Sequence, residues 1–143
     1  VDADAALTES TGRTPAEWIQ KEGEPAFRIA EASLLEDLLA KGKTVVALGG
    51  GIVTTPSALG WLRQFPHVLA LHTSLSTLQE RQASAPRPAL TDLSPEDELQ
   101  KLWEQRATAY DLAAQGRWFS TNGEELEVLS RIVSATQAWH DVN

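Results

Sequence analysis

The sequence contains no cysteine, and it has fewer basic than acidic residues. Without cysteine the chain can form neither a disulfide nor a thiolate metal site, which fits a reducing compartment, so we expect a cytoplasmic protein. The formal net charge of −8 argues against a nucleic-acid partner. The sequence has no apolar run of membrane-spanning length and no signal-peptide pattern at its start, so we also expect no membrane partner.

The length of 143 residues suffices for one domain with a proper core. The sequence shows no internal repeat, linker or low-complexity segment, and we expect a single domain over residues 1–143. Its first residue is Val1 rather than methionine. This start predicts a chain that was processed, excised or cut out of a longer one.

A short apolar run that leads into three successive glycines is the most informative stretch. Val45–Leu48 reads as a buried strand of a parallel sheet, and Gly49, Gly50 and Gly51 follow it directly. Ligands of open α/β sheets bind at the carboxyl ends of the strands, where glycines leave backbone N–H groups uncovered. The alternative is a glycine-rich turn that only leads into the next helix. The glycines alone leave both interpretations open.

Helices alternate with short apolar strands along the rest of the chain. Caps, prolines and apolar spacing predict helices over about 14–22, 24–40, 55–64, 75–81, 95–114 and 124–139. Further strands are expected over 67–71 and 117–121. This alternation is typical of an α/β fold with a parallel sheet.

Four groups of charged residues are candidates for a site. Asp2 and Asp4 either leave the end of a strand together or open a helix as acidic first-turn residues, and the residues alone favour the helix. Arg28 and Glu31 have the spacing of an ion pair on one helix face, although most helical arginines are solvated. Arg106 and Tyr110 share a helix face in the same way. The segment 82–94 holds Arg87 between two prolines and reads as an active-site lid or as a plain loop.

These residues resemble the shikimate kinase family over nearly the whole chain. Each motif alone is weak, but five occur in the family's order and spacing, and they are Asp2-Ala3-Asp4, the G-E-x-x-F-R-x-x-E segment from Gly23 to Glu31, Gly49-Gly50-Gly51, Arg87-Pro88 and Arg106 with Tyr110. The resemblance implies a three-layer α/β/α fold of the P-loop NTPase class, similar to nucleoside-monophosphate kinases. It implies transfer of a phosphoryl group from ATP to the 3-hydroxyl of shikimate.

The resemblance also implies a role for each matching residue. Arg28 and Arg106 would clamp the shikimate carboxylate, for which a planar guanidinium is well suited. The remaining substrate-binding assignments are Glu31, which would hold Arg28, Phe27, which would form a wall for the ring, and the backbone of Gly49, Gly50 and Gly51. Asp4 would bind the ring hydroxyls and take the proton from the attacking one.

The ATP and Mg²⁺ assignments follow from the same resemblance. Arg87 would close over ATP and neutralise charge on the transferring phosphoryl group. Asn122, in the turn before the last helix, would contact ATP, and Asp2 would hold water around Mg²⁺. The resemblance implies a monomer when the protein is complete, with shikimate and ATP as its small-molecule partners.

One motif of the family does not occur in the 143 residues. The phosphate-binding loop G-x-x-G-x-G-K-[ST] precedes Asp2-Ala3-Asp4 in the family, together with the first strand. Gly42-Lys43-Thr44 does not replace it, because that loop must run from a strand into a helix. We therefore expect a fragment of a shikimate kinase that lacks activity and is poorly stable by itself.

Three other interpretations remain open at this stage. A shikimate-kinase-like domain without the loop could be the non-catalytic, ligand-sensing part of a regulator. A related small-molecule kinase such as a gluconate kinase is a second possibility, although Arg28 and Arg106 need a carboxylate between them. An α/β module that binds a protein partner is the third.

Overall fold

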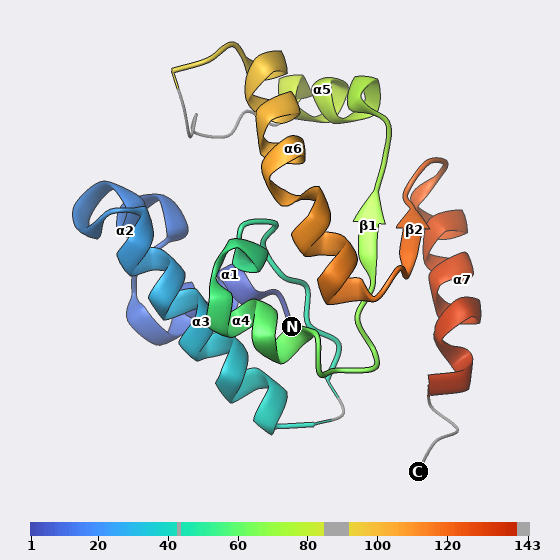
Figure 1. Ribbon diagram of the computed structural model, residues 1–143, viewed down its shortest axis with the longest axis horizontal. Coiled ribbons are helices and arrows are strands. Elements are labelled where there is room, and N and C mark those ends of the chain that lie inside the picture. The colour runs from blue at the N-terminus through green and yellow to red at the C-terminus, as the bar shows by residue number, and fades with distance from the viewer. Residues whose placement is uncertain (43, 85–91, 140–143) are drawn as a thin grey trace. The chain divides into compact units, whose positions relative to one another are not determined.

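Helix α3 (Glu24–Ala40) is the centre of the first of two units in the chain, which span Val1–Gln64 and Phe65–Asn143. The structure is a computed structural model, and it describes residues 1–42, 44–84 and 92–139. In the first unit, α3 packs against α1 (Ala3–Thr11), α2 (Pro15–Glu22), the 3₁₀ turn η1 (Ile52–Thr54) and α4 (Pro56–Leu62) (Figure 1). The side chains on α3 therefore reach the neighbouring segments of this unit.

The first two helices begin at side-chain caps, and the sequence predicts the second of these caps. Asp2 caps α1, because its carboxylate accepts the Ala5 N–H at 2.9 Å. Thr14 and Glu17 form a complete capping box at the start of α2, with the Thr14 N–H donating to Glu17 Oε2 at 2.8 Å. Gly23 ends α2 at φ +85° and also precedes α3, a backbone conformation that glycine adopts readily and other residues rarely do.

The core of the first unit consists of aliphatic side chains around one face of α3. Leu35 and Ile52 are its largest fully buried side chains, with 2% and 1% of their surface exposed. Other buried apolar residues of this unit are Ala3, Leu7, Phe27, Ala32, Leu38, Val53, Ala58 and Leu62. Burial of this surface is the main favourable contribution to the stability of the unit.

The strand expected over Val45–Leu48 is wrong for this structure. Val45 is 84% exposed, and only Ala47 forms a bridge, a parallel one to Asp2. The Ala47 N–H donates to Val1 O at 2.8 Å, and the Ala3 N–H donates to Ala47 O at 3.0 Å. Among the described residues of this unit, no segment other than the one around Asp2 pairs with Val45–Leu48. The apolar run therefore has no second strand beside it in this unit and is not buried.

The second unit holds the parallel strand pair of the structure. Strands β1 (Ala70–His72) and β2 (Trp118–Ser120) pair in parallel, with Leu71 opposite Phe119 (Figure 1). This confirms the expected parallel pairing, although β1 begins three residues later than predicted and Leu71 is 59% exposed. The helices of the unit are α5 (Leu75–Ser84), α6 (Pro95–Ala114) and α7 (Glu125–Thr136), and the 3₁₀ turn η2 (Gln137–Trp139) follows.

The boundaries of the helices in the second unit confirm most of the expectations. Helix α6 has its predicted bounds, and Ser94 caps it by accepting the Asp97 N–H at 3.2 Å. Helix α5 extends to Ser84, so the first residues of the expected lid are helical instead of irregular. Residues 85–91 of the expected lid, which include Arg87, lie outside the described residues.

Among the residues described, no helix combines the length and the apolar character that are needed to cross a membrane.

Candidate functional site

Arg28 lies between two carboxylates on the same helix. Its Nη1 donates to Glu31 Oε2 at 2.6 Å, and its Nη2 and Nε donate to Glu24 Oε1 at 2.9 and 3.2 Å. The three residues have the i,i+3 and i,i+4 spacings that bring side chains together on a helix. The predicted pair of Arg28 and Glu31 is therefore confirmed, and Glu24 is a second partner of Arg28.

The two carboxylates differ in how far water reaches them. The Glu31 side chain is 3% exposed, whereas the Glu24 side chain is 47% exposed and that of Arg28 is 14% exposed. Burial by itself lowers the pKa of Arg28, but hydrogen bonds to Glu31 and Glu24 and the attraction of their charges outweigh it and raise that pKa. The guanidinium is therefore a fixed positive charge that is bound on its Glu31 side to a buried anion.

Two glycines allow the charged side chains of α3 to approach the loop after Leu48. A Cβ atom on Gly51 would overlap the guanidinium of Arg28, so this group lies directly against the Gly51 backbone. A Cβ atom on Gly49 would lie 2.9 Å from Glu31 Oε1 and 3.7 Å from Asp4 Oδ1. The structure thus brings together five residues that the sequence singled out, namely Asp4, Arg28, Glu31, Gly49 and Gly51.

Phe27 lies behind the guanidinium and belongs to the core. It is 3% exposed, and the Arg28 Cζ atom lies 5.1 Å from the centre of its ring. A cation over an aromatic face is attracted to it, so the ring helps to hold Arg28 in position. Its expected role as a wall for a substrate ring stays a prediction.

Asp2 lies both at a strand-like bridge and at the start of a helix, which are the two positions that the sequence left open for it. It lies in a strand-like bridge with Ala47, and it also caps α1 through Oδ1. Carboxylate oxygens are the ligands that Mg²⁺ prefers, and Mg²⁺ commonly takes one or two of them together with water and substrate phosphates. In residues 1–42, 44–84 and 92–139 no group of three or more His, Cys, Asp or Glu side chains could hold a metal by itself. Asp2 therefore fits a water-mediated Mg²⁺ site by its chemistry.

Apart from Gly50, which lies in the first unit between Gly49 and Gly51, the remaining predicted site residues lie in the second unit or outside the described part of the chain. Arg106 is half-buried on α6, and the ring of Tyr110 meets Trp118 edge-on with centroids 6.2 Å apart. Asn122 accepts a hydrogen bond from the Thr73 hydroxyl, and its carbonyl accepts one from Arg131 Nη2 at 2.8 Å. Because Arg28 and Arg106 belong to different units, a clamp formed by the two stays a prediction.

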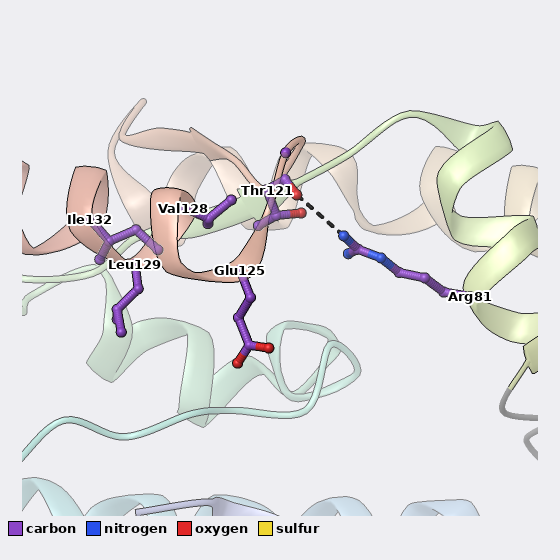
Figure 2. A pocket seen from close by; sticks show the side chains of 7 residues that line it. Arg81, Thr121, Glu125, Val128, Leu129 and Ile132 are labelled. Carbon is purple, nitrogen blue, oxygen red and sulfur yellow. Dashed lines mark hydrogen bonds between the residues drawn. The ribbon is translucent and has the colours of Figure 1, made fainter.

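A cavity of about 480 Å³ opens beside Asn122 in the second unit. Figure 2 shows Arg81 from α5 pointing toward Thr121, whose carbonyl oxygen accepts from Arg81 Nη2 at 3.2 Å. The lining of the cavity also includes Gly123 and four residues of α7, which are Glu125, Val128, Leu129 and Ile132. The sequence analysis missed Arg81 as a cavity residue, because its only signal was a basic residue in the last turn of a helix.

Comparisons with known proteins agree with the class of fold. A solved shikimate kinase from Acinetobacter baumannii in complex with shikimate superposes with a TM-score of 0.84 at 27% identity, over 99% of this chain and 79% of that one. A shikimate kinase from Bacteroides thetaiotaomicron gives a TM-score of 0.80 at 20% identity and covers 98% of this chain and 82% of that one. The protein therefore has the α/β fold of kinases of the P-loop NTPase class that resemble nucleoside-monophosphate kinases.

Sequence relatives narrow the class to one family. The profile for shikimate kinase matches residues 1–137. The shikimate kinase of Halorhodospira halophila is 37% identical over 96% of this chain and 78% of its own length. The shikimate kinase of Enterococcus faecalis is 33% identical over 93% of this chain and 80% of its own length. The chain belongs to the shikimate kinase family.

Proposed function

We propose that the protein serves the transfer of the terminal phosphoryl group of ATP to the 3-hydroxyl of shikimate, and that the 143 residues, which do not include the family's phosphate-binding loop, hold the side chains that bind shikimate. The observation that supports this most directly is the cluster of Arg28, Glu31 and Asp4 around the glycine loop. It places a guanidinium fixed by a buried carboxylate in the same part of the unit as a second carboxylate. A small acid with several hydroxyl groups needs both kinds of contact.

The substrate-binding step divides between these side chains. Arg28 holds the substrate carboxylate through the paired N–H groups of its guanidinium, and the role that the resemblance gives to Arg106 stays a prediction. Asp4 accepts hydrogen bonds from the ring hydroxyls and takes the proton of the 3-hydroxyl as it attacks phosphorus. Gly49, Gly50 and Gly51 present the backbone of the loop to the substrate.

The nucleotide step rests on fewer described residues. Asn122 lies in sequence between Thr121 and Gly123, which both line the cavity of the second unit, and this position suits a contact with ATP. Arg87 neutralises charge on the transferring group. When Mg²⁺ is bound it offsets phosphate charge, and Asp2 holds it through water. Phosphoryl transfer depends mainly on such positioning and electrostatic stabilisation.

Titration calorimetry with shikimate tests the binding step on the 143-residue chain. Arg28→Lys keeps the positive charge but loses the planar pair of donors, so we expect binding to weaken by about ten- to a hundredfold, the range for hydrogen bonds to charged groups. Arg13→Lys is the matched control, because Arg13 forms an exposed ion pair with Glu22 in the same unit. Equal affinities of wild type and Arg28→Lys would contradict the proposed carboxylate site.

A further inference from the structure

Glu24 occupies the side of Arg28 that is best suited to bind another carboxylate. The Nε and Nη2 atoms of a guanidinium present two parallel N–H groups, which match the two oxygens of a carboxylate. In this structure both atoms donate to one oxygen, Glu24 Oε1, at 3.2 and 2.9 Å. Glu31 takes Nη1 instead. A ligand carboxylate that approaches the Nε and Nη2 edge therefore meets Glu24 there first.

The local charge also opposes an anionic ligand while both glutamates are in place. One guanidinium faces two carboxylates, so the three side chains together carry a net negative charge at neutral pH. A third carboxylate binds the same cation more favourably once one of the two withdraws. The charge balance thus favours the exchange of one glutamate for the ligand carboxylate.

Burial determines which glutamate can withdraw. Glu31 is 3% exposed, and separating it from Arg28 would leave a buried charge with less compensation, which is strongly unfavourable. Glu24 is 47% exposed, and an ion pair at such a position contributes little because water replaces the lost partner. Glu24 also sits in the first turn of α3, where the helix dipole favours a carboxylate even without Arg28.

We propose that Glu24 is a displaceable substitute for the substrate carboxylate. It holds the Nε and Nη2 edge of Arg28 in the free protein and yields that edge when the substrate binds, while Glu31 stays in place as the permanent partner. The proposal rests on the proposed function, in which Arg28 binds the substrate carboxylate. It gives opposite roles to two glutamates that contact the same guanidinium: Glu31 positions Arg28 for the substrate, and Glu24 competes with the substrate.

Calorimetry with two ligands and three variants tests this division of roles. Glu24→Gln keeps the size of the side chain but removes the charge that competes, so we expect shikimate to bind about two- to fivefold more tightly, the range for an exposed ion pair. Glu31→Gln should weaken binding. The methyl ester of shikimate has no carboxylate, and its affinity should not change in Glu24→Gln. The control is Glu36→Gln, an exposed residue of the same helix, which should bind shikimate as the wild type does.

The Nε–H signal of Arg28 in ¹H–¹⁵N spectra separates displacement from a general effect of charge. In the wild type this signal should move when shikimate is added and should stay in place with the methyl ester, because only the acid replaces Glu24. A signal that stays in place while shikimate binds would overturn the proposal. Weaker or unchanged shikimate binding in Glu24→Gln would do so as well. If the wild type binds no shikimate, or if Arg28→Lys binds it equally well, the proposed function itself fails.

Discussion

Substitution of Gly51 by alanine tests the close approach between α3 and the glycine loop. Gly51 has φ −82° and ψ −17°, a conformation that any residue adopts, so alanine there causes no backbone strain. Its methyl group would instead occupy the space of the Arg28 guanidinium. Since an arginine side chain can rotate away, we expect Arg28 to leave this position and its contact with the buried Glu31 to weaken.

The size of the effect follows from the contact that is lost. Removing one partner of a buried ion pair costs about 3–5 kcal/mol, but Arg28 remains present and partly exposed, so this range is an upper bound. Overpacking a filled site typically costs about 1–3 kcal/mol. We therefore expect Gly51→Ala to lower the free energy of unfolding by about 1–3 kcal/mol and to weaken shikimate binding as well.

Gly60→Ala is the matched control for this experiment. Gly60 lies inside α4, and a Cβ atom there would meet no atom within 4 Å. Alanine is favoured over glycine in a helix by about 0.5–1 kcal/mol, so this variant should be more stable than the wild type. Urea unfolding of the three proteins, followed by tryptophan fluorescence, measures both changes. If Gly51→Ala unfolds like Gly60→Ala and binds shikimate like the wild type, the argument from the close approach is refuted.

Two further predictions concern the helix starts of the first unit. Hydrogen bonds from the backbone and side chain of Thr14 lower the pKa of Glu17, so its contribution to stability should be present above about pH 4.5 and be lost as the pH falls through the lowered value. Glu17→Gln does not titrate, and the stability difference between wild type and this variant should shrink over that range in acid-to-neutral urea unfolding series; a constant difference would contradict the assignment. Asp2→Ala should lower the free energy of unfolding by about 1 kcal/mol through loss of the cap of α1. Asp2→Asn keeps a hydrogen-bond acceptor, so its free energy of unfolding should fall much less. Equal decreases in the two variants would argue against capping by Asp2.

Sequence patterns that span only a few residues, such as helix caps, predict where helices begin. The capping box of Thr14 and Glu17 and the cap at Ser94 set the starts of α2 and α6, and the structure confirms both. The run Val45–Leu48 was mispredicted because a strand depends on neighbours that lie elsewhere in the chain. Its composition suits a buried strand, but in the described part of the first unit only the segment around Asp2 pairs with it.

The candidate site divides in the same way between local and distant contacts. The pair of Arg28 and Glu31 follows from helical spacing alone, and this spacing also applies to Glu24. The sequence analysis quoted Glu24 only as part of the segment from Gly23 to Glu31 and gave it no role of its own. The approach of Gly49 to Asp4 joins residues far apart in the sequence, and only the family resemblance suggested it.

The structure also explains why the loop needs glycine at two positions. The sequence left open whether the glycines expose backbone to a ligand or only form a turn. In the structure, the space beside Gly51 is filled by Arg28 and the space beside Gly49 borders Glu31 and Asp4, so the close approach of the protein's own charged side chains already accounts for glycine there. The glycines by themselves are therefore no evidence for a ligand. They matter because they let a guanidinium rest against bare backbone, and a cation held in this way can exchange one carboxylate for another without moving.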